Sequence, residues 1–191
     1  MFFLSKPSVE IINKFILSQK NKNYTYKDIA ATRNQPPIDY VIDRNRIKLG
    51  TGKTAFEKAK AALLKWKMYD FPWVEICWDN TPIETDQVVA VLANTLGFWS
   101  LNACRIVYTL EEFGEVDKFG FAYGTLPAHV ESGEERFSIE WDHTTNNVYY
   151  DLLAFSRPNY LIVKLGYPVC RMFQKKFAKD SKQAMLKAVN S

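Results

Sequence analysis

The chain has 191 residues, of which 47% are hydrophobic, and its formal net charge is +4. This length supports one well-buried core rather than two, so a single domain is expected. The cysteines, Cys77, Cys104 and Cys170, are odd in number and widely spaced, which argues against a disulfide framework and favours the cytoplasm. No stretch reaches the ~20 apolar residues of a spanning helix, and the first apolar run is too short for a signal peptide.

The first forty residues are expected to form a helix and a loop. Residues 7–19 carry apolar side chains at helical spacing, at Val9, Ile12, Phe15 and Ile16. A polar, Asn-rich connection follows and closes at Pro37. We therefore expect residues 1–40 to be appended to a single domain of residues 41–191, and the sequence leaves open whether they pack on it.

A first strand and a helix are expected next. Ile47 and Leu49 alternate with charged residues, as in a strand with one buried face. Thr54 with Glu57 three residues later forms the pattern of a capping box, which predicts a helix running to about Trp66.

The residues at this helix start also resemble the end of a phosphate-binding loop, Gly52-Lys53-Thr54. That motif requires a glycine five positions earlier, where this chain has Ile47. A nucleotide site is therefore not expected, and an anion at the helix N-terminus is a minor alternative.

Six further strands are expected after this helix. Short, turn-rich connections separate them, so the neighbours are predicted to pair antiparallel rather than through crossover helices. The predicted strands are residues 73–78, 87–94, 101–110, 117–125, 134–141 and 147–155.

The chain is expected to close with a short helical segment after residues 156–158, a break at residues 166–168 and a long helix to about Ala188. One apolar stripe is predicted for this C-terminal part, formed by Leu165, Val169, Met172 or Phe173, Phe177, Ala184 and Ala188. Its partner is the apolar side of the sheet, to which Phe137, Ile139 and Trp141 contribute.

This order of elements predicts an α+β helix-grip fold, in which a curved antiparallel sheet of about seven strands wraps around the long C-terminal helix. START-like lipid carriers, birch-pollen-allergen-like proteins and polyketide cyclases share the order, which is an analogy of fold and not of function. The fold leaves space between sheet and helix, and that space is the default ligand site.

Four blocks of sequence carry a resemblance to a known family. They are Leu49-Gly50-Thr51-Gly52 with Phe56 and Ala59; residues 101–108; residues 119–137; and residues 154–158 with Leu165-Gly166-Tyr167-Pro168. Over almost its whole length the chain resembles uncharacterised protein family 0548. Ala128 departs from the glycine or small polar residue expected there.

Two groups of strand residues are candidates for function. Gly120, Ala122 and Gly124 share one face and would either let the terminal helix approach closely or leave volume for a ligand. Polar residues in the predicted strands would form either a salt-bridged structural network or the polar end of a cavity that binds a carboxylate, phosphate or hydroxyl. These candidate ligand-binding residues are Arg105, Tyr108, Tyr123, Thr125, Glu135, Arg136, Tyr150 and Arg157.

His129 lies in a predicted turn with Glu131 and Glu134, and this trio is the candidate catalytic group. A histidine beside a carboxylate can transfer protons near neutral pH. The alternative is a histidine that stabilises the turn or lies on the surface. His129 and Glu131 supply two metal ligands at most, so neither a metal nor a cofactor is expected.

The C-terminal part is the basic element, because from Asn159 onward it holds seven basic residues and only Asp180 as an acid. A solvated helix face and an acidic membrane surface both explain these charges, whereas nucleic acid is not expected, because the aromatic residues follow the apolar stripe.

The sequence therefore leaves three functions open. The first is binding of a hydrophobic or amphipathic small molecule between the sheet and the terminal helix. The second is a cofactor-free cyclase or isomerase that uses His129 with Glu131 or Glu134. The third is an interaction or membrane-surface protein that acts through the basic helix. The ligand's identity and the oligomeric state are not determined.

Overall fold

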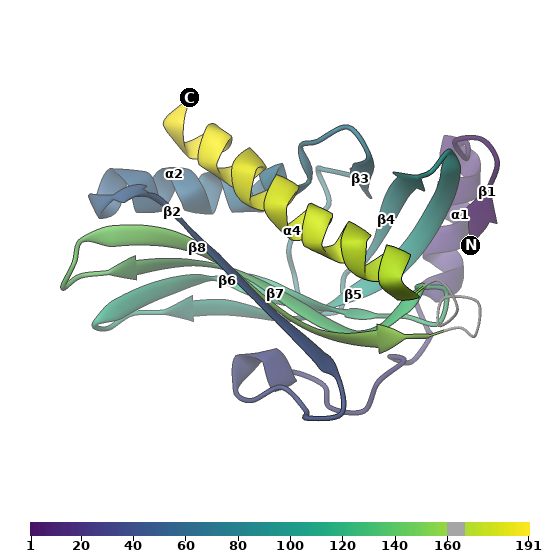
Figure 1. Cartoon of the computed structure of the whole chain (residues 1–191), viewed down its shortest axis with the longest axis horizontal. Coiled ribbons are helices and arrows are strands. Elements are labelled where there is room, and N and C mark those ends of the chain that lie inside the picture. Colours follow the sequence, from purple (N-terminus) through teal and green to yellow (C-terminus); the bar gives the residue numbers. More distant parts are fainter. Residues whose placement is uncertain (160–166) are drawn as a thin grey trace.

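A curved antiparallel sheet wraps around the C-terminal helix α4 in the computed structural model, which describes residues 1–159 and 167–191. The sheet has eight strands in the order β2-β8-β7-β6-β5-β4-β3, with β1 paired to β5, and the described pairs are antiparallel. The strands are β1 Phe2–Phe3, β2 Val41–Thr51, β3 Val74–Cys77, β4 Val88–Thr95, β5 Phe98–Glu112, β6 Val116–Thr125, β7 Glu131–Asp142 and β8 Asn147–Pro158. The helices are α1 Val9–Gln19, α2 Gly52–Leu64 and α4 Tyr167–Asn190, with 3-10 turns η1 Ala31–Arg33 and η2 Lys67–Tyr69. The predicted helix-grip fold is confirmed (Figure 1).

The start of α2 differs from the prediction. The helix begins at Gly52, so Thr54 lies inside its first turn, and the residue before the helix, Thr51, makes no side-chain capping hydrogen bond. Strand β2 continues through Thr51, and Gly52 has a φ of 75° while its amide donates to the carbonyl of Asn146 at 2.9 Å. A left-handed glycine therefore turns the strand directly into the helix, and the capping-box prediction is wrong.

Side-chain alternation gives the sheet an inner face toward α4 and an outer face on the opposite side. Phe121, Phe137 and Leu152 are neighbours on the inner face and belong to the main hydrophobic core, together with Leu63 of α2 and Met185 of α4. Their rings and side chains are almost completely buried. This side of β7 faces the core as expected, but α2 rather than α4 makes the main helix contact with it, and α4 lies on β2 and β8.

The buried stripe of α4 is offset from the predicted one. The side chains buried against the sheet are Ala178, Ser181, Met185 and Val189. The predicted stripe residues Val169 and Met172 are instead 44% and 54% exposed, and Phe177 packs only partly against the core. Polar Ser181 is accepted at the centre because its hydroxyl lies 2.9 Å from the hydroxyl of Tyr150. The predicted short helical segment and Leu165 fall largely or wholly outside the described residues.

Polar side chains fasten α4 to strands β2 and β8. Arg171 donates both terminal nitrogens to the carboxylate of Asp43, at 2.5 and 2.7 Å. This bidentate geometry fixes the angle of the helix as well as its position. Further hydrogen bonds along the helix join Gln174 to Ser156, Lys182 to Asn45 and Asn190 to the carbonyl of Leu49.

The N-terminal part of the chain covers the outer face, and Figure 1 shows the η1 region on the side of the sheet opposite α4. Ile12 and Phe15 of α1 pack on β4 and β5. A Cβ atom added to Gly124 would lie 2.0 Å from the hydroxyl of Tyr26. Gly124 therefore admits this segment, whereas a Cβ on Gly120 would meet the backbone of β7 at Phe137, so neither glycine serves α4 or a ligand as the sequence interpretations expected. The division of the chain at residue 40 remains a prediction.

The carboxylate of Glu134 is the central contact of this covering. It accepts hydrogen bonds from the hydroxyl of Tyr26 (2.8 Å), the amides of Ala30 (2.8 Å) and Thr32 (3.0 Å), and the hydroxyl of Thr32. Glu134 itself is almost fully buried. Four donors on one buried carboxylate satisfy it and order the N-terminal segment.

We expect Glu134→Gln to lower the free energy of unfolding by roughly 3 kcal/mol. The amide nitrogen of the glutamine is a hydrogen-bond donor, and it would face the donors that now bind the carboxylate oxygens. Urea unfolding measures this change, and the Ala30 and Thr32 amides should exchange their hydrogens faster. The exposed Glu112→Gln is the matched control. An unchanged stability with unchanged exchange at Thr32 would contradict this role of Glu134.

Candidate functional site

A cavity of about 490 Å³ lies between the inner face of the sheet and the first half of α4. Strands β2, β4, β6, β7 and β8 contribute to its lining, as do the turn η2 and the start of β3. Its volume falls within the range of small-molecule sites, roughly 300–1,000 Å³. The space predicted between sheet and helix therefore exists at the N-terminal half of α4.

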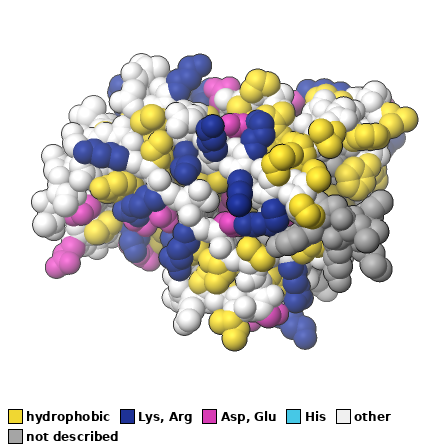
Figure 2. All heavy atoms as spheres, viewed as in Figure 1, with side chains coloured by type: hydrophobic (Ala, Val, Ile, Leu, Met, Phe, Trp, Pro, Cys, Tyr) yellow, Lys and Arg dark blue, Asp and Glu magenta, His cyan; other side chains and the backbone are white. Residues whose placement is uncertain are grey.

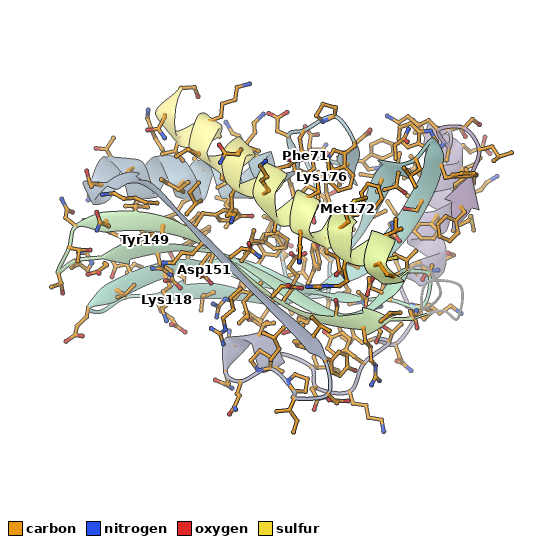
Figure 3. The ribbon with its side chains drawn as sticks, in the orientation of Figure 1. Phe71, Lys118, Tyr149, Asp151, Met172 and Lys176 are labelled. Atoms are coloured by element: carbon orange, nitrogen blue, oxygen red, sulfur yellow. The ribbon has the colours of Figure 1, made fainter. Side chains whose placement is uncertain are left out.

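Aromatic side chains form one wall of this cavity. Phe173 and Phe177 lie one turn apart on α4, so their rings point to the same side. The ring of Phe177 is 5.4 Å from that of Tyr69, and the ring of Phe173 is 5.7 Å from that of Trp73. Phe71, labelled beside α4 in Figure 3, contacts Phe177 at 5.8 Å. The wall is therefore a packed set of rings with little freedom to collapse into the cavity.

Glu135 forms the polar part of the cavity floor. The hydroxyl of Tyr123 donates to Glu135 Oε2 at 2.8 Å, and the hydroxyl of Tyr69 lies 2.6 Å from that of Tyr123. Since Tyr123 gives its hydrogen to the carboxylate, Tyr69 donates to Tyr123. Burial raises the pKa of Glu135 to about 7, opposed by the Tyr123 hydrogen bond and reinforced by Asp43.

Glu131 is the second acid of the floor and is only 9% exposed. Its Oε2 atom has no hydrogen-bond partner among the described residues. Burial raises the pKa of Glu131 to about 7, an effect that Arg171 opposes and Asp43 reinforces. Two carboxyl groups that change charge near neutral pH therefore face this cavity.

His129 also lines the cavity, but it is bound to the turn rather than to a carboxylate. The amide of Glu131 donates to His129 Nδ1 at 2.9 Å, which assigns the ring proton to Nε2. Burial lowers the pKa of His129 to about 4, so the ring is neutral at physiological pH. These contacts support the interpretation of a turn-stabilising histidine.

Four of the candidate ligand-binding residues lie on the inner side of the sheet. Tyr123, Thr125 and Glu135 line the cavity. Tyr150 is fully buried beneath α4, where it contacts Ser181, and is not part of the lining.

The other four candidates lie outside the cavity and have structural partners. Arg105 donates to the carbonyls of Gln19 and Lys20, Tyr108 contacts the hydroxyl of Thr32, Arg136 binds the Thr32 carbonyl and Asp151, and Arg157 pairs with Asp39. Glu134 differs from them, because it lines the cavity while its carboxylate binds the N-terminal segment. The sequence-based set is thus divided between a cavity and a structural network, and the functional roles of its members remain predictions.

Several cavity residues escaped the sequence analysis as site residues. They are Asp43, Tyr69, Trp73, Phe173, Phe177 and Cys170. One signal existed for the aromatic pair on α4, because Phe173 and Phe177 are spaced as helix neighbours. Asp43 and Tyr69 had no such signal, since their place depends on how β2 and η2 meet α4.

The described residues contain no group of three or more histidine, cysteine, aspartate or glutamate side chains placed to hold a metal ion. Within the same residues, no helix combines the length and the apolar character needed to cross a bilayer. Neither finding excludes a function, and the expected absence of a metal stays a prediction.

Comparison with known proteins shows relatives along the whole chain. The chain is 41% identical over 210 residues to a UPF0548 protein of Dictyostelium discoideum, covering 100% of this chain and 97% of the relative. It is 34% identical over 207 residues to a UPF0548 protein of Arabidopsis thaliana, covering 100% of both. A family model described as "Domain of unknown function (DUF1990)" matches residues 25–184. The sequence-based assignment to uncharacterised protein family 0548 is thereby confirmed.

Similar solved structures are more distant. A crystal structure of Ara h 8.0201 matches with 11% identity and a TM-score of 0.47, covering 78% of this chain and 97% of that one. A crystal structure of human STARD10 matches with 11% identity and a TM-score of 0.46, covering 96% of this chain and 81% of that one.

The half-buried cavity acid Glu135 should make stability depend on pH. Because its pKa in the folded protein is about 7, above the ordinary 4.5, the folded state binds the proton more tightly than the unfolded chain does. The resulting stability is fully present below about pH 4.5 and is lost as the pH rises through about 7. Between about pH 5 and pH 8, the free energy of unfolding should fall by roughly 2–3 kcal/mol less in Glu135→Gln than in the parent protein.

Urea unfolding at a series of pH values measures this loss for the parent protein and the variant. Glu115 is an exposed acid in the turn between β5 and β6. In Glu115→Gln the free energy of unfolding should change with pH as it does in the parent. If Glu135→Gln loses stability as steeply as the parent, the carboxyl group is not buried as the structure has it.

Proposed function

Since this chain belongs to the UPF0548 family, whose domain is described as having an unknown function, we propose a function from its cavity: it binds a hydrophobic or amphipathic small molecule between the sheet and α4. The observation that carries the proposal is an aromatic-walled cavity of about 490 Å³ with a few convergent polar groups. Sites for small molecules combine an apolar lining with a small number of placed polar side chains in this way.

The packing along the sheet supports a preserved cavity rather than a loosely packed core. Under α2 and the second half of α4, large side chains such as Phe121 and Ile139 fill the inner face completely. Toward the first half of α4 the inner positions carry small side chains, Ala93 and Ala154, which are only half-buried although they lie inside the sheet. Ala154 lies between Asp43 and Glu135 in the strand register. Small residues at these positions keep the volume open.

A cofactor-free proton-transfer reaction is the second candidate. The observation that favours it is the pair Glu131 and Glu135, because a general base works best when its pKa is near the working pH. His129 contributes less than the sequence analysis expected, since its Nδ1 is occupied and its pKa is low. Glu134 faces the N-terminal segment instead.

The membrane alternative rests on α4, whose lysines lie along the surface that Figure 2 shows in front. Lys176 already contacts Asp180 at 2.5 Å and lies 4.4 Å from the ring of Trp73. Such pairing is typical of a solvated helix face. Binding to acidic membranes stays a prediction, and sedimentation with acidic vesicles at low salt tests it.

Filling the cavity should weaken binding. We expect Ala154→Trp to lower the affinity for the neutral apolar dye Nile red about tenfold or more, because the indole would occupy the space beside Glu135. Fluorescence titration measures the affinity, and native mass spectrometry of both proteins detects any small molecule that co-purifies. Ala61→Trp, on the exposed side of α2, adds the same ring outside the cavity as the control.

Thermal unfolding must show that the Ala154→Trp protein is folded. Equal dye binding by folded Ala154→Trp and the parent would contradict the cavity as the binding site. A parent protein that binds no dye and carries no molecule on purification would contradict the proposed function itself.

A further inference from the structure

The polar groups of the cavity indicate which class of molecule it accepts. Resting on the proposed function, we infer that the ligand carries a cationic group, a protonated amine or amidine, which pairs with the carboxylate of Glu135 while an apolar body lies against the aromatic wall. The inference follows from the donors that Glu135 already has, from the charges around it and from the rings that face it.

Glu135 has one oxygen committed to the protein and one available. Oε2 accepts from Tyr123, whose position is fixed in turn by Tyr69. Among the described residues no hydrogen bond reaches Oε1, and the side chain is half-buried while it lines the cavity. A carboxylate oriented by two tyrosines, with one oxygen left toward the cavity, is prepared for a donor supplied by a ligand.

The charges beside this space are predominantly negative. Asp43, Glu131 and Glu135 line the cavity, and Arg171 lies beside them with both terminal nitrogens bound to Asp43 and one also to Gln174. His129 is neutral and supplies no positive charge. A cation would relieve the repulsion between the acids, and an anion would increase it.

Two basic residues also line the cavity, and both are exposed. Arg44 alternates with the inward-facing Asp43 and Asn45 on β2, and Lys175 lies on α4 beside Gln174. Their charges keep contact with water, so they are screened far more than the buried acids. They do not replace a cation at Glu135.

The aromatic wall favours the same ligand class. Tyr69 and Phe177 line the cavity together with Trp73, one face of which Lys176 already contacts. The faces of aromatic rings attract cations, most strongly where water is excluded. A carboxylate combined with several ring faces is the chemistry that recognises an ammonium group, and the same rings bury a hydrocarbon body.

The arrangement along β7 limits how such a molecule lies. Glu131 precedes Glu135 by four residues on the same strand, so their Cα atoms are roughly 13 Å apart and one ammonium group cannot contact both. Gly133 lies between them, where an added Cβ would come within 1.9 Å of the carbonyl oxygen of Phe155. Gly133 also lines the cavity, so the floor between the two acids carries no side chain.

Titration of Glu135 supports the inference with a definite sign. The charged and titratable groups around it are Asp43 and Arg44 from β2, Tyr123 from β6, Tyr69 from η2, Lys175 from α4, and Glu131 and His129 near the start of its own strand, with Arg171 of α4 bound to Asp43. Because the pKa of Glu135 is about 7, a cation must displace a proton below that pH. Affinity for the cation should therefore rise with pH up to about 7 and level off above it.

The test compares three ligands with the same hydrocarbon chain: octylamine, 1-octanol and octanoate. Isothermal titration calorimetry at about pH 7.5 should show octylamine binding about tenfold or more tightly than either other ligand. Only its ammonium group can form a charged hydrogen bond with the carboxylate of Glu135. Glu135→Gln should remove this preference without weakening 1-octanol. Glu115→Gln, which removes the same charge in an exposed turn outside the cavity, should preserve it.

The outcomes separate this inference from the proposed function. If the three ligands bind equally, if octanoate binds best, or if the amine preference survives in folded Glu135→Gln, the cationic class is wrong while the cavity still binds apolar molecules. If none of them binds, both proposals fail. Should Glu135→Gln not fold, the parent protein decides: octylamine affinity that does not rise between about pH 5.5 and pH 7.5 overturns the inference.

Discussion

The alternation of side chains along β7 is the constraint on which the rest of this structure depends. Both faces of this strand are covered, the inner face by α2 and the core that α2 shares with α4, and the outer face by the N-terminal segment. A strand sends successive side chains to opposite faces, so Glu135 points to the cavity while its neighbour Glu134 points to the outer covering. Two adjacent carboxylates thereby acquire different roles: Glu134 is satisfied by four donors, and Glu135 keeps an oxygen for the cavity.

The two coverings stabilise the sheet by different means and leave the cavity where they do not reach. Outer-face packing uses small residues, such as Gly124, that let Tyr26 approach closely. Inner-face packing fills one half of the sheet with aromatic rings and holds the first half of α4 through Arg171 and Asp43. That ion pair fixes α4 at a distance from the small side chain of Ala154. The cavity between the helix and Ala154 therefore persists. Burying the acids there costs stability at neutral pH, a cost that is typical of functional sites.

The sequence predicted the element order, the antiparallel strands and the helix-grip arrangement, because periods of two and of 3.6 residues are local properties. It also placed Phe137 on the inner face of the sheet, and the same alternation assigns Glu135 to that face. The phase of the α4 stripe could not be fixed in this way, since polar Ser181 is buried only because Tyr150 meets it. The covering of the outer face depends on contacts about a hundred residues apart in the chain, such as Tyr26 with Glu134, for which no periodicity gives a signal.

The central claim is that β7 presents Glu135 to a cavity that holds cationic ligands and Glu134 to the protein itself. Carbon-13 NMR of the glutamate carboxyl groups tests it most directly, by following each signal with pH in the free protein and with octylamine added. The account predicts that Glu135 titrates near pH 7 when free and at lower pH with the amine, while the Glu134 signal does not respond to the ligand. A Glu135 that titrates at the ordinary value of 4.5, or an amine that moves Glu134 instead, would contradict the account.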